Sequence, residues 1–533
     1  MAYDYSPFPY TAPPGLSAPE PRHPVAIVGA GPIGLAMAVD LALRGVKSVV
    51  LDDNNVVSVG SRAICWAKRT LEIFDRLGVG DRMLEKGVTW KVGRNFFGKD
   101  EVYNFDLLPE PGHKYPAFIN LQQYYVEQYL IERAQEFPDL IDLRFLNEVI
   151  GHTDHDTHVS LKIETPDGPY SLDADWYIAC DGAGSPTRNR MNLPFEGQTF
   201  EEHFLIVDVE MEQSPFGDHD TPERWFWFAP PFHPGQSALL HKQPDNIYRI
   251  DLQLGPDTDP KTEATEEKVT PRLKAMLGDK PFRLDWMSVY KFRCARLDRF
   301  VHNRVLFVGD SAHVVSPFGA RGGNGGIQDL DNLGWKLAAV LHGDAPATLI
   351  ETYNEERTHG SAENILHSSR ATNFMTPKSP IEALFRDQVL NLATTHPFAR
   401  RLINSGRLSQ PCSLAGMSLQ TPGTAPVQPG EALIDAPIKG PNGDTWLIAE
   451  AQGQFTLLGF GEVTLPTIPG NACIGINSRA AYPCFEDVEG HATRRYGRNH
   501  IYLIRPDGHI CAVFDRPDAA AVTAAYTQAR GIQ

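Results

Sequence analysis

The chain has 533 residues, 42% hydrophobic and 22% charged, which is enough for two or three domains with real cores. Its 49 basic and 66 acidic side chains give a net charge of −17, which argues against a nucleic acid or an anionic membrane as partner. The seven cysteines show no C-x-x-C spacing, and no apolar run has the length of a membrane span. We therefore predict a cytoplasmic protein with reduced thiols and without a zinc site. For residues 1–23 we predict a mobile tail, with docking through its tyrosines as the alternative.

Residues 25–45 combine a short apolar strand, a glycine motif and a helix rich in alanine and leucine. The motif is G-x-G-x-x-G, formed by Gly29, Gly31 and Gly34. Its glycines permit a tight turn, approach of a pyrophosphate to the backbone, and close packing of helix on strand. The next apolar strand ends at Asp52, placed to accept from a ribose hydroxyl. This arrangement predicts a dinucleotide site; a turn chosen only for packing is the alternative.

Two later strands also end in an acid, Asp181 before Gly182 and Asp310 after Gly309. Because parallel strands bring their carboxyl ends to one edge of a sheet, we place both acids on the ligand edge. A glycine-rich stretch, residues 319–326, follows, and we predict the next helix from Ile327. The stretch predicts a loop of N–H groups suited to a negatively polarised group, with a flexible turn as the alternative.

The segments 88–107 and 200–300 have the pattern of antiparallel strands, the first as a hairpin that leaves the nucleotide domain. On residues 246–254, Arg249, Asp251 and Gln253 alternate with apolar side chains, so this strand has one polar face. That face, beside two tryptophans, Trp225 and Trp227, is a candidate pocket floor. A half-solvated strand with the tryptophans in the core fits equally well.

Three other features have less specific patterns. Arg62 lies in a loop where it could pair with a pyrophosphate or be a surface arginine. The turn 152–158 has three histidines, but its hairpin position favours a solvated loop over a metal site. The proline-dotted stretch 404–430 predicts a linker, followed by an α/β module of about 100 residues.

The three strand ends, in this order, resemble the single-component flavoprotein aromatic hydroxylases, the family of para-hydroxybenzoate hydroxylase. The resemblance covers residues 24 to about 345. The linker and final module resemble the longer members, such as phenol hydroxylase, which end in a thioredoxin-like domain. The predicted α/β fold has a Rossmann-like FAD-binding domain interleaved with an antiparallel-sheet substrate domain, and a thioredoxin-like C-terminal domain without C-x-x-C. The expected ranges are 24–87, 110–200 and 300–345 (FAD-binding domain), 88–109 and 201–299 (substrate-binding domain), 346–429 (helical segment and linker) and 430–533 (thioredoxin-like domain).

The resemblance also implies roles for matching positions. For the nucleotide part of FAD, it assigns Gly29, Gly31 and Gly34 to the pyrophosphate, Asp52 to the ribose and Arg62 to the phosphates. For the flavin part, it places Gln123 beside the flavin, with Glu127 four residues on, Asp310 at the ribityl chain, and the backbone of Gly322, Gly323 and Asn324 toward flavin N1 and O2. Asp181 and Gly182 would support the bound FAD. The resemblance places Arg249 over the flavin and Pro317 in the wall of the reaction site, where Ser316 replaces the first proline of a Pro-Pro pair.

The implied activity is hydroxylation of a small phenolic substrate with O2 and NADH or NADPH, through a flavin C4a-hydroperoxide. The base that touches the substrate hydroxyl stays open among His241, Asp251, Tyr248 and His233. We also expect a homodimer. The alternatives are an FAD-dependent dehydrogenase or reductase that does not insert oxygen, and a non-catalytic FAD-binding interaction protein. A halogenase is disfavoured because no Gly-Trp-x-Trp-x-Ile-Pro stretch is present.

Overall fold

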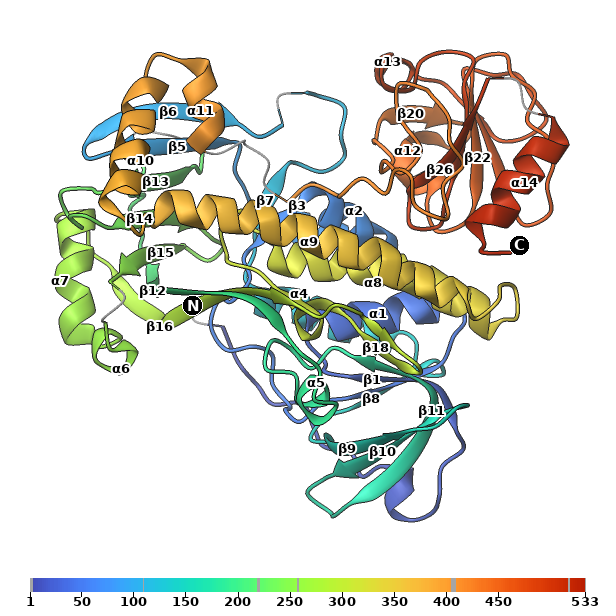
Figure 1. The fold of residues 1–533 in the computed structure, drawn as a ribbon, viewed down its shortest axis with the longest axis horizontal. Helices are drawn as coiled ribbons and strands as arrows, with labels where there is room; N and C mark the ends of the chain where they lie inside the picture. The colour runs from blue at the N-terminus through green and yellow to red at the C-terminus, as the bar shows by residue number, and fades with distance from the viewer. Residues whose placement is uncertain are drawn as a thin grey trace.

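The computed structural model describes residues 3–108, 110–217, 221–255, 258–403, 409–515 and 518–532. Its first part is a three-layer α/β domain around a mainly parallel sheet of order β17-β18-β11-β1-β2-β8, which the β9–β10 hairpin extends beside β11 (Figure 1). Within the described ranges, no helix is long and apolar enough to cross a membrane. The strands are β1 (His23–Val28), β2 (Ser48–Leu51), β8 (Ile141–Arg144), β9 (Glu148–Asp154), β10 (Val159–Glu164), β11 (Tyr170–Ala179), β17 (Val301–His302) and β18 (Val305–Phe307).

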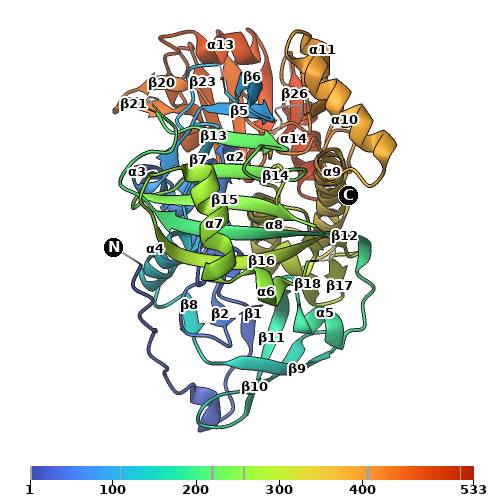
Figure 2. The ribbon, with the colours of Figure 1, turned by 90° about the vertical axis from the view of Figure 1, so that its left-hand side faces the viewer.

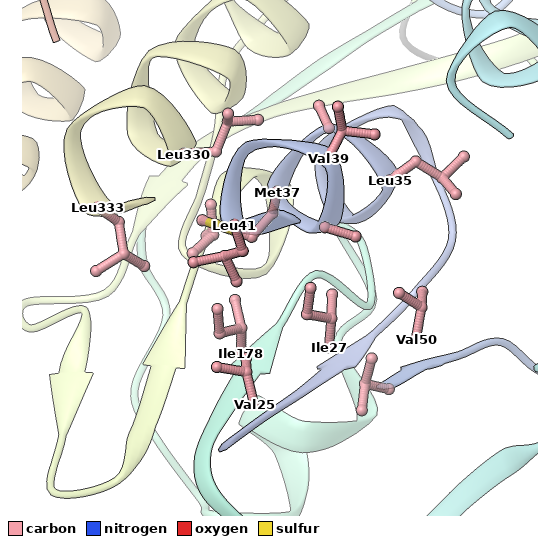
Figure 3. Close-up of a cluster of buried hydrophobic side chains, with 14 of the residues drawn as sticks. Val25, Ile27, Leu35, Met37, Val39, Leu41, Val50, Ile178, Leu330 and Leu333 are labelled. Carbon is pink, nitrogen blue, oxygen red and sulfur yellow. The ribbon is translucent and has the colours of Figure 1, made fainter. Parts of the chain in front are cut away.

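The core of this domain lies between the central strands and two helices. Val25, Ile27, Val50 and Ile178 project from the sheet toward Met37 and Leu41 of α1, and Leu330 and Leu333 of α8 lie beside α1 (Figure 3). The strands are buried on nearly all positions, as expected for a parallel sheet covered by helices. The helices and short turns are η1 (Pro14–Leu16), α1 (Pro32–Leu43), α2 (Lys68–Leu77), α3 (Gly80–Lys86), α4 (Gln123–Gln135), α5 (Pro186–Arg190), η2 (Gly309–Ser311) and α8 (Gly322–Leu341).

The N-terminal segment, which we expected to be a mobile tail, lies against this domain. The rings of Tyr3 and Tyr124 are 4.2 Å apart, and Phe8 stacks on Phe145 at 4.8 Å. The backbone N–H of Phe8 also donates to the carbonyl of Asn55. In this structure the segment therefore has the docked arrangement that its tyrosines offered as the alternative.

The second sheet has the order β19-β16-β12-β15-β14-β13-β5-β6 and is antiparallel except where β5 runs parallel to β13. The predicted hairpin is present as β5 and β6, and it joins this sheet rather than the nucleotide-binding one. Helix α7 covers the outer face, where its apolar side chains pack on β12 and β15 (Figure 2). The elements are β5 (Val92–Phe97), β6 (Asp100–Asp106), β12 (Glu196–Glu210), β13 (Arg224–Phe228), β14 (Ser237–Lys242), β15 (Ile247–Leu254), α6 (Pro260–Glu263), α7 (Glu266–Leu277), β16 (Arg283–Arg296) and β19 (His313–Val314).

A small three-stranded sheet and three helices connect these two domains. The sheet is formed by β3 (Cys65–Ala67), β7 (Phe118–Asn120) and β4 (Val88–Thr89). The helices are the long α9 (Leu349–Met375), which packs on α8, and the paired α10 (Pro380–Ala393) and α11 (Pro397–Ile403) beside β6.

The C-terminal part is a separate α/β unit with its own five-stranded sheet, of order β24-β23-β22-β25-β26 (Figure 1). Strands β22, β23 and β24 are parallel, and β25 and β26 continue the sheet in antiparallel fashion. The elements are β20 (Pro437–Gly440), β21 (Gly443–Trp446), α12 (Leu447–Ala451), β22 (Thr456–Phe460), β23 (Ala472–Ile476), β24 (Cys484–Phe485), α13 (His491–Tyr496), β25 (Ile501–Ile504), β26 (Ile510–Phe514) and α14 (Ala519–Ala529).

One predicted boundary is wrong: α8 begins at Gly322, not at Ile327. The glycines therefore form the first turn of the helix rather than a loop before it. The reason is close packing, because a Cβ on Gly326 would lie 2.7 Å from Ile33 and 3.2 Å from the backbone of Gly309. A helix without side chains at this end can lie directly against α1 and η2.

Candidate functional site: a channel between the two sheets

Glycine occupies the three motif positions for different physical reasons. Gly29 has φ +105°, and a Cβ there would lie 2.4 Å from the carbonyl oxygen of Cys180. A Cβ on Gly34 would lie 1.9 Å from the carbonyl oxygen of Gly29. A Cβ on Gly31 would meet nothing within 4 Å, so this backbone faces open space. Gly29 and Gly34 are needed for turn and packing, whereas Gly31 leaves room for a ligand.

A first cavity, of about 250 Å³, lies at the carboxyl ends of β1, β2 and β11 and is lined by Gly29, Gly31, Asp52, Asp181 and Gly182. We call it the nucleotide cavity. The Asp52 carboxylate is held in place by the backbone N–H groups of Ala30 and Asn54. Burial raises the pKa of this carboxyl despite these donors. A fixed acceptor thus stands at the end of β2, where a ribose hydroxyl was predicted.

Asp181 has a local role as well. Its carboxylate accepts from the Ser185 hydroxyl at 2.6 Å and from the Thr187 N–H at 2.9 Å, which caps the short helix α5. Arg188, on this helix, donates to the carbonyl of Ser311 at 2.9 Å. Asp181 and Gly182 therefore fix the wall of the nucleotide cavity and link it to the next strand end.

A second cavity, of about 610 Å³, continues from Gly31 between the two sheets. We call it the FAD channel. Its lining includes Asp310, whose side chain is exposed to it and makes no hydrogen bond or ion pair to another residue of the described chain. The surrounding protein shields this carboxyl from bulk water and so raises the pKa of Asp310, while the nearby His313 partly opposes the rise. An acceptor without a protein partner points to a ligand hydroxyl.

A buried residue that the sequence reasoning missed holds Asp310 in position. Asp329 of α8 accepts from the Gly309 N–H at 3.1 Å, from His313 Nε2 at 2.6 Å and from Arg357 at 2.6 Å. Burial opposes its charge, but His313 and Arg357 outweigh burial and lower the pKa of the Asp329 carboxyl. The sequence offered one signal for this residue, an aspartate at a position on the buried face of α8.

The N-terminus of α8 faces the same channel. Gly322 and Gly323 carry N–H groups that have no acceptor within the helix, and Gly323 lines the FAD channel. The Asn324 side chain is instead structural: it accepts from the N–H of Ala67 at 2.9 Å and donates to the carbonyl of Cys65 at 2.9 Å. Free amides and the positive end of the helix dipole therefore meet at this wall.

Gln123 and Arg62 lie on the opposite wall of the channel. Gln123 accepts from the Ala63 N–H at 3.2 Å and donates to Ser58 and Glu127 at 3.0 and 2.8 Å, which pins the loop before β3. The exposed Arg62 donates to the hydroxyl of Tyr290 at 3.0 Å and does not line the nucleotide cavity. Its contact with phosphates stays a prediction.

A third cavity, of about 240 Å³, adjoins the channel, and we call it the reaction cavity. Arg249 and Pro317 line both spaces, so they lie where channel and cavity meet. The apolar walls are Trp66, Trp90, Phe204, Leu239, Phe292 and Phe318. Ser316, also in the wall, donates or accepts at 2.7 Å with Thr372, so the loop is held by a hydroxyl pair where relatives were expected to carry proline.

Arg249 is buried and paired. Its guanidinium donates to Asp251 at 2.8 Å and to the carbonyl of Arg62 at 2.7 Å. Burial disfavours the cation, but Asp251 and Asp208 outweigh burial and raise the pKa of the Arg249 guanidinium. Burial in turn raises the pKa of the Asp208 carboxyl to about 6. The cation is therefore fixed at the end of the channel.

Of the four candidate bases, two face the reaction cavity. His241 and Asp251 line it, whereas Tyr248 packs into the apolar cluster on the other face of β15. His233 lies outside the cavity and contacts the carbonyl of Gln253. Burial, together with Arg224 and Arg249, lowers the pKa of His241 well below its usual value. Its imidazole is thus neutral at neutral pH, and it is a weaker base than an ordinary histidine.

The predicted pocket floor is present in part: Arg249 and Asp251 of the polar face of β15 line the reaction cavity, but Trp225 and Trp227 lie on the other face of the sheet. Trp225 and Trp227 pack against Phe96 and neighbouring rings. Arg224, Phe226 and Phe228, on the other face, line cavities instead. Side-chain alternation along the strand separates the two sets. Arg224 was not among the predicted site residues.

No group of three or more His, Cys, Asp or Glu side chains suited to a metal is found among the described residues, and the predicted solvated turn lies between β9 and β10. All seven cysteines are free thiols.

The described positions fit FAD. The open backbone at Gly31 lines both the nucleotide cavity and the FAD channel, the carboxylate of Asp310 and the amide of Gly323 line the channel, and Gly322 lines the adjoining reaction cavity. They offer, in order, room for a diphosphate, an acceptor for a hydroxyl chain and donors for a polarised ring.

Comparison with known proteins agrees with this geometry. Residues 22–368 match the FAD binding domain family. A flavin-dependent monooxygenase of Mycobacteroides abscessus is 32% identical over 381 residues, which span 68% of this chain and 77% of that protein. A 3-(3-hydroxy-phenyl)propionate/3-hydroxycinnamic acid hydroxylase of Escherichia coli K12 is 29% identical over 82% of this chain and 78% of that protein.

Among solved structures, the flavin-dependent monooxygenase PieE, in complex with FAD and substrate, superimposes with TM-score 0.80 at 21% identity over 96% of this chain and 98% of that one. Aklavinone-11 hydroxylase, with FAD and aklavinone, gives TM-score 0.76 at 19% identity, covering 96% of this chain and 100% of that one.

Proposed function

Since the chain belongs to the FAD binding domain family, among flavin-dependent monooxygenases that hydroxylate aromatic compounds, we propose that it hydroxylates a phenolic substrate with O2 and NADH or NADPH. The observation that carries this proposal is the junction at Arg249 and Pro317, where the FAD channel opens into a cavity walled by aromatic side chains. A cavity lined by aromatic and other apolar side chains, with a few polar groups, is the kind of site that binds an aromatic ring.

The cofactor would be held by residues on one wall. Gly31 leaves room for the diphosphate, Asp52 would accept from the adenosine ribose, and Asp310 from the ribityl chain. The amides of Gly322 and Gly323 would donate to the flavin ring at the end of α8. Bound FAD, once reduced by NAD(P)H, supplies the oxygen-activating chemistry.

The chain's own residues would prepare the substrate. The walls formed by Trp66, Phe292 and Phe318 exclude water from the ring. The neutral imidazole of His241 would accept a hydrogen bond from the phenolic hydroxyl and so orient the ring, because its lowered pKa leaves it too weak a base to remove the proton. Arg249 would place a positive charge beside the channel end, held there by Asp251.

The test is a panel of phenolic acids, alkylphenols and polycyclic phenols, with NAD(P)H oxidation, O2 uptake and hydroxylated product measured together. We expect at least one class to stimulate NAD(P)H oxidation and to gain one oxygen atom from O2. Stimulated oxidation with an electron acceptor but without oxygen incorporation would favour the dehydrogenase or reductase instead. Protein purified without FAD, and unable to bind it, would favour a non-catalytic role.

We also propose that the C-terminal unit is a thioredoxin-like domain without redox chemistry, and that the protein is a homodimer. The mixed five-stranded sheet and the absence of vicinal thiols among the described residues support the first part. Light scattering after gel filtration tests the second.

A further inference from the structure

A cavity rich in arginine adjoins the reaction cavity. It has a volume of about 390 Å³ and is lined by Arg224, Arg321, Arg370 and Arg401, together with His367. The two spaces share Arg224, Phe318, Gly319 and Arg321. None of the described residues that line this arginine cavity is acidic. Four guanidinium groups thus gather around one space in a chain of net charge −17.

Arg224 is one of two arginines at the boundary of the two cavities, the other being Arg321. Arg224 makes no hydrogen bond or ion pair to another residue of the described chain, and its guanidinium carbon lies 5.9 Å from the ring of Phe226. Burial lowers the pKa of the Arg224 guanidinium, with partial compensation from Cys65 and Asp251. Arg224 is half-buried and lines both cavities, so its guanidinium is available to an anionic group of a ligand.

Carboxylates lie near Arg224, but they are already paired with other arginines. Glu223, next to Arg224, binds Arg94 of β5 at 2.6 and 2.9 Å, and Glu101 binds the same guanidinium at 2.9 Å. In the reaction cavity, Asp251 is paired with Arg249. The carboxylate that faces Arg224 is thus neutralised by another arginine.

The outer arginines have different surroundings. Arg370 of α9 and Arg401 of α11 are exposed side chains, and no hydrogen bond or ion pair joins either to another residue in the described ranges. Arg321 instead donates to Asn364 at 2.9 Å and is part of the framework. Phe226, Phe228 and Phe318 add apolar surface between these cations.

We propose that the arginine cavity binds the acidic group of the substrate, so that this enzyme acts on aromatic carboxylic acids. The ring would lie in the reaction cavity, and its carboxylate would pair with Arg224, with Arg401 adding charge from the outer side. A guanidinium binds a carboxylate through two parallel hydrogen bonds, which also fixes the orientation of the ring. This inference rests on the proposed function, because it assigns the substrate class of the same site.

The test uses two probes that carry no phenolic hydroxyl, 3-phenylpropionate and 3-phenylpropionamide. They differ in charge and have nearly equal size. Titrated calorimetrically into the FAD-loaded protein at pH 7, the carboxylate is expected to bind about tenfold more tightly than the amide. Arg224→Gln should abolish that preference, and Arg224→Lys should keep part of it. Arg82→Gln, which removes an exposed arginine of α3 paired with Glu132, is the control that should change nothing.

Equal affinity of acid and amide in the wild type would overturn the proposal, as would an unchanged preference in Arg224→Gln with normal FAD content. If Arg224→Gln does not fold, Arg401→Gln decides: we expect it to reduce the preference about threefold, and no reduction would overturn the proposal. Because neither probe is a phenol, this result is independent of oxygen insertion. A clear acid preference without hydroxylation of any phenol would refute the proposed function alone.

Discussion

Arginines gather in two regions of this molecule, and their surroundings are opposite. At the interface with the C-terminal unit, Arg505 donates to both carboxylate oxygens of Glu356 at 2.6 and 2.9 Å, and it also pairs with Asp507. Lys336 reaches the same Glu356 carboxylate at 2.8 Å. In the arginine cavity, Arg224 has no such partner within the described chain.

The difference separates structural from functional charge. The interface joins α8 and α9 to the C-terminal unit, and each buried cation there has a carboxylate from the same chain. The arginine cavity leaves its counterion to a ligand. Removing charge should therefore be destabilising in the first region and harmless to folding in the second.

The largest expected effect is at the interface. Glu356→Gln leaves Arg505 and Lys336 buried with too little negative charge, so we expect the free energy of unfolding to fall by about 3–5 kcal/mol. Urea unfolding of the FAD-loaded protein measures it. The control on the same helix is Glu351→Gln, since Glu351 and its partner Arg299 are 54% and 53% exposed. That change should cost less than about 1 kcal/mol; equal losses would contradict the comparison.

The same carboxylate predicts a pH dependence. Burial alone would raise the pKa of Glu356, but Arg505 and Lys336 outweigh burial and lower it from 4.5 to about 2. A lowered pKa means that the stabilisation is complete above pH 4.5 and is lost as the pH falls toward about 2. The loss should reach about 3 kcal/mol. Unfolding curves at pH 6, 4.5 and 3 should show this loss of unfolding free energy developing in the wild type. In Glu356→Gln this part of the pH dependence should be absent.

Asp310 is the acidic counterpart of Arg224, since both are charged side chains of the site that make no ion pair with the residues the structure describes. Asp310→Ala removes the proposed acceptor for the ribityl chain, so FAD affinity should fall by about 1–3 kcal/mol. Titration of the apoprotein with FAD, followed by flavin fluorescence, gives the constant. Asp298→Ala, at an exposed position, is the control. Wild-type affinity in Asp310→Ala would remove Asp310 from the site.

Arg249 is intermediate, since it has one carboxylate partner and lies at the channel end. Arg249→Ala should slow substrate-stimulated flavin reduction about tenfold, equivalent to ~1.4 kcal/mol, and raise peroxide release per NAD(P)H. FAD binding should change little. Stopped-flow reduction and a peroxide assay measure these quantities. If both stay at wild-type values, Arg249 is only a partner of Asp251.

The smallest expected effect on stability is at Arg224. Because Arg224→Gln leaves no carboxylate without its partner among the described residues, the free energy of unfolding should stay within about 0.5 kcal/mol of wild type or rise. The urea experiment used for Glu356→Gln provides the comparison. A loss of several kcal/mol would show that Arg224 is structural and that the two regions do not differ.

Local sequence determined the nucleotide end of the site. The spacing of Gly29, Gly31 and Gly34, and the acids Asp52 and Asp310 after apolar strands, depend on residues close in the chain. Turn geometry and strand ends follow from such neighbours, so the sequence predicts them. The antiparallel hairpin 92–106 was likewise recognisable from its alternation and central glycine.

Tertiary structure alone decided which charges are compensated. Glu356 and Arg505 are far apart in the chain, as are Arg94 and Glu223, and no local pattern marks either pair. It also decided which face of β13 lines a cavity, because an alternating strand offers two faces and only its neighbours in the sheet select one. Arg224 is a basic residue among aromatic ones in the sequence; only the folded protein puts it beside two cavities, with no ion pair to any residue in the described ranges.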